Sequence, residues 1–199
     1  MQGDERLGQA MEVFWERGYY DTSIDELMER TGFHRAEVYG RFGSKQRLFE
    51  AALRQYRENV IRAFVEPLAR PDASLADVER FFHGICDRAT APKRRRGCLM
   101  VNTASEVSPH IPSVAAIVTS FLEELRGLLR RACVNARKRG ELRPDVDVDR
   151  VADYLVGAVL GLWGLARSPA PETMLRHYVD GVLASASGPR RRGSRPRRR

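Results

Sequence analysis

The sequence predicts an all-α fold, and three observations support this prediction. Apolar residues recur at positions i, i+3 and i+4 along most of the 199-residue chain, which is the period of helices with one buried face. No segment alternates apolar and polar residues between turn signals, so no sheet is expected. An apolar fraction of 43% with 8% aromatic residues is enough to bury a core, which excludes disorder for most of the chain.

The first fifty residues predict three short helices. An apolar stripe over Leu7–Trp15 ends at Gly18, where a helix C-cap is expected. Ser23–Glu26 has the pattern of a capping box that opens a second helix, which stops at the Thr31–Gly32 turn. A third segment runs from about His34 to Phe42.

Start and stop signals predict the longer helices that follow. They are expected from Ser44 to Pro67, from Ser74 through Ile85, from Pro112 to about Gly140, from Asp147 or Asp149 onward and from Pro171 onward, with an apolar stretch over Cys98–Val107. Residues 188–199 (GPRRRGSRPRRR) combine Gly, Ser and Pro with seven arginines and no acidic residue, so this tail is expected to be disordered.

The net charge of +8 belongs mostly to that tail. Subtracting its seven arginines from the 34 basic residues leaves 27, against 26 acidic residues. The body of the chain is therefore nearly neutral, and total charge does not by itself identify it as a nucleic-acid binder.

The sequence lacks the signals of disulfide-rich, zinc-binding, secreted and membrane proteins. Three widely spaced cysteines, Cys86, Cys98 and Cys133, exclude a disulfide framework and a zinc ribbon and favour a reducing cytoplasm. The N-terminus has no secretory apolar region, and the longest charge-free apolar run, residues 154–166, is shorter than the about 20 residues of a membrane span. We therefore expect a soluble, cytoplasmic protein without a membrane partner.

Catalysis has no signal here either. The four histidines are scattered without metal-ligand spacing, and GxSxG, Walker and GxGxxG motifs are absent. The expectation is no enzyme activity, no catalytic residue, no metal and no cofactor. Cys98 follows a basic run that would lower its thiol pKa and suit a sensor of electrophiles or oxidants, whereas a small buried hydrophobe is the alternative for all three cysteines.

The second and third helices, joined by a Thr-Gly-Phe turn, have the lengths of a helix-turn-helix, whose second helix enters the DNA major groove. Val38 and Phe42 are expected to face inward. Arg35, Glu37 and Arg41 are expected to face outward, where arginine pairs with guanine and glutamate accepts from cytosine. Flanking polar groups that suit phosphate oxygens are Thr22, Ser23, Tyr39 and Lys45.

The stretch Ala10–Leu53 resembles the N-terminal region of the TetR family of bacterial transcriptional regulators. The matching features are Gly18-Tyr19, Thr22-Ser23, Thr31-Gly32, Val38-Tyr39 with Phe42, and Lys45 ahead of Leu48-Phe49. Gly97–Ala104 and Glu141–Asp145 look like parts of a C-terminal domain of that family. The resemblance implies a helix-turn-helix DNA-binding domain over residues 1–50, a helical effector-binding and dimerisation domain over 51–187, and the Arg-rich tail over 188–199.

The resemblance also implies which residues meet DNA. The expected contacts are Thr22, Ser23, Arg35, Ala36, Glu37, Tyr39, Gly40, Arg41 and Lys45. His34 departs from the serine-like cap usual in the family, so the start of the third helix is expected to be looser. Residues 1–50 hold seven basic and ten acidic side chains, while Arg35–Arg47 holds four basic and one acidic, so DNA affinity is expected to depend on a small patch.

A small-molecule effector and a second copy of the chain are the other partners that the resemblance implies. The expected effector pocket is formed by Phe82, Cys86, Met100, Asn102, Phe121 and Trp163, for which plain core packing is the alternative. The expected homodimer interface includes Gly157, Gly161, Gly164, Tyr178 and Val182. Each glycine costs a helix about 0.8–1 kcal/mol against alanine, which close packing against a partner or within the monomer would offset.

The expected function is a sequence-specific transcriptional regulator, a repressor that a small molecule releases from a palindromic double-stranded operator. The alternative is an architectural or nonspecific nucleic-acid binder that works through the arginine tail. A third possibility is an all-α enzyme or carrier with an incidental helix-turn-helix, which no residue pattern supports.

Overall fold

The computed structural model describes residues 2–91 and 96–187, and within these ranges it contains helices and no strand. The expected tail at 188–199 lies outside the described residues. The elements are α1 Gln2–Arg17, α2 Ile24–Thr31, α3 Arg35–Phe42, α4 Lys45–Tyr56, η1 Arg57–Ile61, α5 Arg62–Ala69, α6 Leu75–Thr90, α7 Leu99–Glu106, α8 Pro112–Lys138, α9 Val148–Arg167 and α10 Glu172–Ser187.

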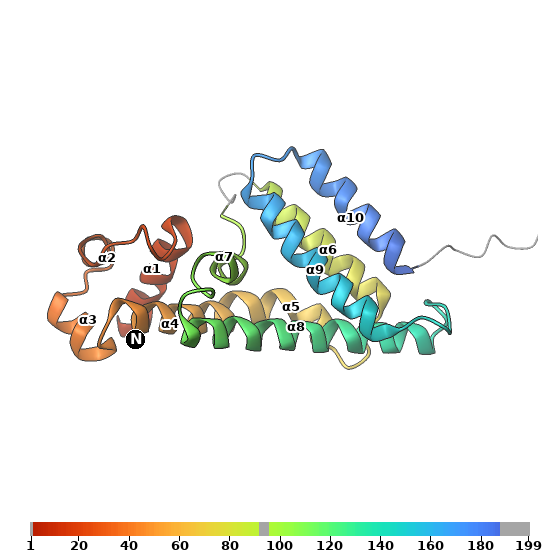
Figure 1. Ribbon diagram of the computed structural model, residues 1–199, viewed down its shortest axis with the longest axis horizontal. Helices are drawn as coiled ribbons and strands as arrows, with labels where there is room; N and C mark the ends of the chain where they lie inside the picture. The colour runs from red at the N-terminus through yellow and green to blue at the C-terminus, as the bar shows by residue number, and fades with distance from the viewer. Residues whose placement is uncertain (1, 92–95, 188–199) are drawn as a thin grey trace, which may run out of the picture.

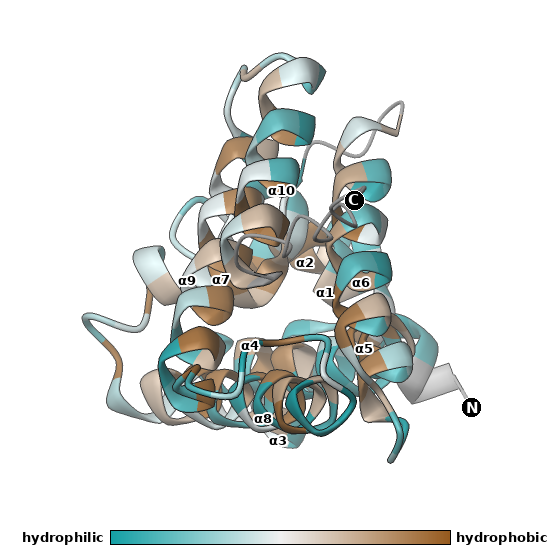
Figure 2. Cartoon of the chain, turned by 90° about the vertical axis from the view of Figure 1, so that its right-hand side faces the viewer, coloured by the Kyte–Doolittle hydropathy of each residue, from teal (hydrophilic) through white to brown (hydrophobic). Residues whose placement is uncertain are grey.

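Two groups of helices are connected by one long pair (Figure 1). Helices α1, α2 and α3 gather at one end of the molecule. The continuous run α4–η1–α5 lies beside α8, and α7 sits between this pair and α9. At the other end α6, α9 and α10 pack together. Hydrophobic segments of the helices face one another across the interior and hydrophilic ones face outward (Figure 2), as amphipathic stripes dictate.

The short N-terminal helices begin and end where the sequence predicts. The Ser23 hydroxyl accepts a hydrogen bond from the Glu26 N–H at 3.0 Å, and Gly32 ends α2 with φ of 67°. Gly43 ends α3 with φ of 82°, a left-handed conformation that glycine adopts without steric cost. The Glu26 carboxylate, which a full capping box would turn back to the Ser23 N–H, pairs instead with Arg17 at 3.3 Å.

The long helix expected from Ser44 to Pro67 differs in two ways. It contains a π-helical turn, η1, and it continues past Pro67 to Ala69. The expected end at Pro67 was wrong because a proline in the last turn removes only one hydrogen bond, which the packing of Val65 and Leu68 in the core offsets. The expected division of the chain at residue 50 falls inside α4, so the two regions share one uninterrupted helix.

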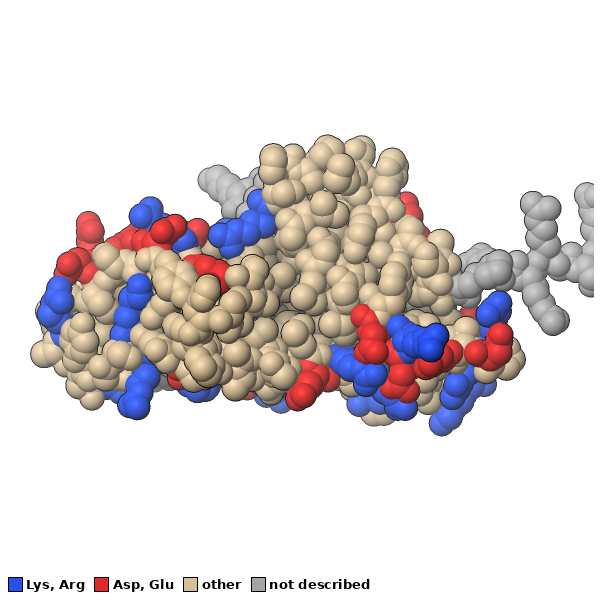
Figure 3. Space-filling view, viewed as in Figure 1, with Lys and Arg blue, Asp and Glu red and all other residues tan. Residues whose placement is uncertain are grey.

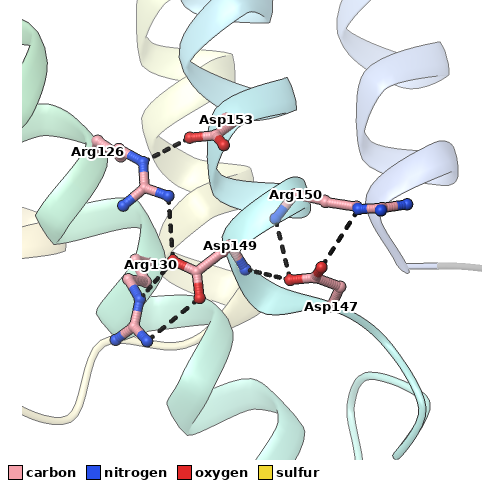
Figure 4. Close-up of polar contacts among 6 residues, drawn as sticks. All are labelled: Arg126, Arg130, Asp147, Asp149, Arg150 and Asp153. Carbon is pink, nitrogen blue, oxygen red and sulfur yellow. Dashed lines mark hydrogen bonds and ion pairs between the residues drawn. The ribbon is translucent and has the colours of Figure 1, made fainter.

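The start of α9 is settled by its capping bonds. The Asp147 carboxylate accepts from the N–H groups of Asp149 and Arg150 at 3.0 and 3.3 Å, so Asp147 is the N-cap. Asp149 then faces α8, where Arg126 and Arg130 donate to it at 3.0 and 2.8 Å (Figure 4). Bonds from both arginines lower the pKa of Asp149. This exposed network links the start of α9 to α8.

No helix in the described ranges is both long enough and apolar enough to cross a membrane.

Candidate nucleic-acid interface

Helix α3 lies at the end of the molecule with one face open (Figure 1). Val38, which is fully buried, anchors the opposite face in the core. At 3.6 residues per turn, the positions most nearly opposite Val38 are Ala36 and Gly40. Both are exposed, and the exposed Arg35 and Tyr39 flank them on one side. The centre of the open face therefore carries small side chains, with long polar ones beside it.

Packing against the described residues does not explain why position 40 of α3 is a glycine. A Cβ built on it meets no atom within 4 Å. Glycine in a helix interior costs about 0.8–1 kcal/mol relative to alanine. No contact with the described residues compensates this cost, so the position favours close approach of another molecule's surface.

Three long side chains around this face reach solvent. The guanidinium of Arg35 forms an ion pair with Asp25, with the two side chains 55% and 75% exposed. Such exposed pairs contribute little stability, so Arg35 is available to another anion. Tyr39 is 46% exposed, and the exposed Arg41 rests over the Phe42 ring at 5.0 Å. These side chains have the chemistry for base edges and phosphates.

Two residues expected to bind phosphate are turned inward. The Thr22 hydroxyl donates to the Gly18 carbonyl at 2.6 Å and is buried. Lys45 Nζ donates to the carbonyls of Tyr19 and Thr22 at 2.9 and 2.8 Å, and burial lowers its pKa. These polar groups satisfy backbone carbonyls that would otherwise lose their hydrogen bonds to water. Burial corrects the expected phosphate contact of Thr22, whereas Lys45 is only half-buried and its phosphate contact stays a prediction.

Glu37, which was expected to contact a base, is paired within the chain. Its two carboxylate oxygens receive both Arg6 guanidinium nitrogens at 2.8 Å, a bidentate pair between α3 and α1. The same guanidinium lies 4.9 Å from the centroid of the Phe33 ring. The pair holds α3 at its angle. Sequence reasoning missed Arg6, because no local pattern links residues 31 positions apart.

Ser23 and His34 stand at the starts of the two helices of the helix-turn-helix. Ser23 is exposed while it caps α2, so its hydroxyl proton is free to meet a phosphate. His34 makes no side-chain cap bond at the start of α3. Acidic side chains gather over α2, and separate basic ones lie over α3 (Figure 3).

Glu106 at the end of α7 joins the helix-turn-helix to the rest of the chain. Its Oε1 accepts from the N–H groups of Tyr19 and Tyr20 at 2.8 and 3.0 Å. A Cβ on Gly18 would lie 2.8 Å from this carboxylate, and the φ of 89° at this position favours glycine. Sequence reasoning did not find this contact, whose partners are about 87 residues apart.

A partly open cavity of about 170 Å³ lies at a second junction, between α1, η1, α6 and α9. Its lining is Glu12, Trp15, Tyr56, Val60, Ile61, Phe64, Arg88, Arg96, Gly97 and Trp163. Of the six expected pocket residues only Trp163 is among them. Phe82, Cys86, Met100 and Phe121 are 0–4% exposed and belong to the packed core, which corrects their assignment. Asn102 does not line this cavity, but its side chain donates to the carbonyl of the lining residue Arg96 at 2.8 Å.

The expected dimer residues separate into two groups. A Cβ on Gly157 or Gly164 would meet nothing within 4 Å, so both remain open to a partner. A Cβ on Gly161 would lie 2.6 Å from the Tyr178 hydroxyl, so packing within the monomer accounts for these two residues. Val182 is 3% exposed and is corrected to a core residue, because a buried side chain has no surface for a partner.

The cysteines are all buried and reduced. Burial raises the thiol pKa of Cys98, and it raises that of Cys133 to about 11. A thiol with a raised pKa is a weak nucleophile. For Cys98 this favours the role of a small buried hydrophobic residue over that of a sensor of electrophiles or oxidants. In residues 2–91 and 96–187 no group of three or more His, Cys, Asp or Glu residues is placed to hold a metal ion.

Two family models match this sequence. The model of bacterial regulatory proteins, tetR family, matches residues 7–52, and that of the tetracyclin repressor-like C-terminal domain matches residues 74–181. The HTH-type transcriptional regulator YezE of Bacillus subtilis (strain 168) is 30% identical over 89% of this chain and 92% of its own. The HTH-type transcriptional repressor ComR of Escherichia coli (strain K12) is 30% identical over 90% and 86%.

Solved structures share the whole architecture. A TetR transcriptional regulator from Chloroflexus aurantiacus J-10-FL has a TM-score of 0.80 at 29% identity, covering 92% of both chains. The TetR family transcriptional regulator CifR, a cysteine mutant complexed with 26-bp double-strand operator DNA, has a TM-score of 0.79 at 29% identity, covering 90% of this chain and 94% of that one. The expected all-α fold, with its helix-turn-helix and C-terminal helical domain, is confirmed.

Proposed function

Because this chain belongs to the TetR family of bacterial transcriptional regulators, we propose that it binds a palindromic operator as a homodimer, represses transcription there, and is released by a small molecule. The coarser function follows from the family: the chain is a DNA-binding transcriptional regulator and not an enzyme. Repression is favoured by ComR, a named repressor of which 86% is covered.

The observation that carries the proposal is the open face of α3. Gly40 and Ala36 let the helix approach base edges closely, while Arg35, Tyr39 and Arg41 stand beside them. Inward bonds of Lys45 and Glu37 fix the angle of α3 before DNA arrives. A preordered reader loses less conformational entropy on binding. Ser23 supplies a phosphate contact at the start of α2.

The division of labour that we propose follows the helices. Residues 1–50 read DNA, and residues 51–187 bind the effector and the second copy. Two connections transmit movement between these regions. Helix α4 follows α3 directly, and Glu106 of α7 holds the Tyr19 backbone just after α1. Binding to successive major grooves requires the two recognition helices to stand about 34–36 Å apart. A ligand that favours a different spacing therefore weakens DNA binding, and DNA weakens ligand binding by the same factor.

Selection from a random-sequence DNA library tests the operator. We expect the full chain to enrich a palindrome whose half-sites are about 10 bp apart, centre to centre, or a multiple of that spacing. Enrichment of no palindrome contradicts the proposal.

Deletion of residues 188–199 separates this function from the architectural alternative. We expect the shortened chain to keep sequence specificity with weaker affinity and a shallower dependence on salt, because fewer arginines displace counterions. Fluorescence anisotropy with specific and scrambled duplexes at several salt concentrations measures both quantities. Loss of all DNA binding would instead favour the tail-driven, nonspecific binder.

A further inference from the structure

We propose that the cavity between α1, η1, α6 and α9 binds a monocyclic aromatic carboxylate, with its ring among the aromatic side chains and its carboxylate on Arg88. This inference rests on the proposed function, because it names the chemical class of the small molecule that releases the operator.

The size of the cavity limits the ligand. Its volume is about 170 Å³. An apolar protein cavity of about 150 Å³ holds one benzene molecule. One six-membered ring with a single small substituent therefore fills this space, whereas a fused polycyclic ligand exceeds it.

The walls suit a flat ring. Four aromatic side chains line the cavity from different helices: Trp15 from α1, Tyr56 from α4, Phe64 from α5 and Trp163 from α9. The Trp15 and Tyr56 rings meet edge to face with centroids 4.9 Å apart, and those of Phe64 and Trp163 are 6.2 Å apart. Aromatic rings favour edge-to-face and offset neighbours of this kind. Both tryptophans of the chain line this one cavity.

The charges of the lining favour an anion. Arg96 is neutralised, since its Nη1 lies 2.5 Å from Glu12 and 3.6 Å from Glu16. Arg88 differs: its guanidinium stacks over Phe64, 5.6 Å from the ring centroid, and no carboxylate of the described residues forms an ion pair with it. A half-buried guanidinium with unused donors binds a carboxylate bidentately.

The location connects the ligand to the DNA reader. Trp15 belongs to α1, which braces the helix-turn-helix, and its Nε1 donates to the Gly97 carbonyl at 3.1 Å. Val60 and Ile61 belong to the π-helical turn η1, on the helix that starts just after α3. π-Turns inside α-helices are frequent at functional sites. A ring in this cavity contacts both α1 and η1, the two elements that connect the cavity to α3. Its binding energy is therefore able to favour one arrangement of α1 and η1.

Tryptophan fluorescence and calorimetry of the full chain test the ligand class with three probes. Benzoate carries the ring and the charge, benzamide the ring alone, and acetate the charge alone. We expect benzoate to quench the fluorescence and to bind at least about tenfold more tightly than benzamide, with no acetate binding, because the charge-assisted bond adds to ring burial. Equal affinities for benzoate and benzamide, or no binding of benzoate, would overturn the assignment.

Two variants test whether benzoate binds in this cavity. Arg88→Gln is expected to weaken benzoate binding about tenfold or more and to leave benzamide unchanged, whereas Arg62→Gln, whose native side chain is 81% exposed outside the cavity, changes neither. Val60→Phe fills the cavity and is expected to abolish binding of both rings. Thermal unfolding of each variant confirms that it is folded, and benzoate binding that survives Val60→Phe contradicts the location.

The failure of this inference is distinguishable from failure of the proposed function. We expect benzoate to release the selected operator from the native chain and not from Arg88→Gln. Specific operator binding that benzoate leaves unchanged overturns the ligand class alone. Absence of any selected operator overturns the proposed function.

Discussion

At the scale of single residues, some polar groups of the helix-turn-helix bond within the chain and others face solvent. Thr22, Lys45 and Glu37 all have side chains suited to DNA, and all three are engaged within the chain. Gly40 has no side chain and is open. The residues that hold the reader in place are thus as polar as the residues that read, and residue type alone does not separate them.

Gly40→Ala tests the close-approach role of the open face. We expect a more stable protein, by up to about 1 kcal/mol, because alanine is the better helix former. We expect operator affinity to fall about tenfold, since the new methyl group stands where the bases approach. Gly127→Ala is the matched control: Gly127 is also an exposed helix-interior glycine with nothing within 4 Å, and it lies far along α8. Unchanged affinity of the Gly40 variant, measured by anisotropy, would contradict this role.

At the scale of elements, α4 is held on α8 by a buried carboxylate. Ser113 Oγ donates to Glu50 Oε1 at 2.6 Å, and Gln46 Nε2 donates to it at 3.1 Å. Burial raises the pKa of Glu50, but the bonds from Ser113 and Gln46 and the charge of Arg54 outweigh it, so the pKa is lowered from 4.5. The ionised form is therefore the one that stabilises the contact between α4 and α8.

Acid titration of stability tests that contact. Since the pKa of Glu50 is lower in the folded chain than in the unfolded one, its contribution is present above its unfolded pKa and is lost as pH falls through the folded pKa. We expect Glu50→Gln to lose less unfolding free energy than the native chain between about pH 6 and about pH 3 in urea titrations. Glu58→Gln, whose native side chain is 62% exposed, should follow the native curve. Parallel curves for native and Glu50→Gln would refute the assignment.

At the scale of the whole molecule, the proposed dimer needs a surface that accepts a second copy. Over most of the upper parts of α9 and α10 the surface in Figure 3 is uncharged. Gly157 and Gly164 are open along α9, and Tyr154 is 46% exposed one turn earlier. An uncharged surface with small residues suits close packing of helices, whereas the charged network of α8 with the start of α9 suits solvent (Figure 4).

Gly157→Leu tests whether this surface is the dimer interface. A Cβ at this position meets no described atom within 4 Å, so we expect the fold to persist while the dimer dissociates to monomers. Analytical ultracentrifugation measures the mass, and circular dichroism the fold. Gly127→Leu places the same side chain at an open glycine of α8 and should leave the dimer intact. A native mass for the Gly157 variant would place the interface elsewhere.

Local signals in the sequence determined the helices and the family of this protein. Ser23, Gly32 and Gly43 mark helix ends because capping bonds and left-handed glycines act over a few residues. The helical period likewise identified Val38 as buried and the opposite face of α3 as exposed.

Only the tertiary structure decided which side chains are free. The Glu37–Arg6 pair, the bonds of Lys45 to carbonyls and the Glu106 contact join residues 23 to 87 positions apart, which no local pattern records. The pocket shows the same limit: Phe82 and Met100 are as apolar as Trp163, and only Trp163 lines the cavity. Hydrophobicity determines that a side chain is buried, whereas the packing of several helices determines whether it faces a neighbour or an empty space.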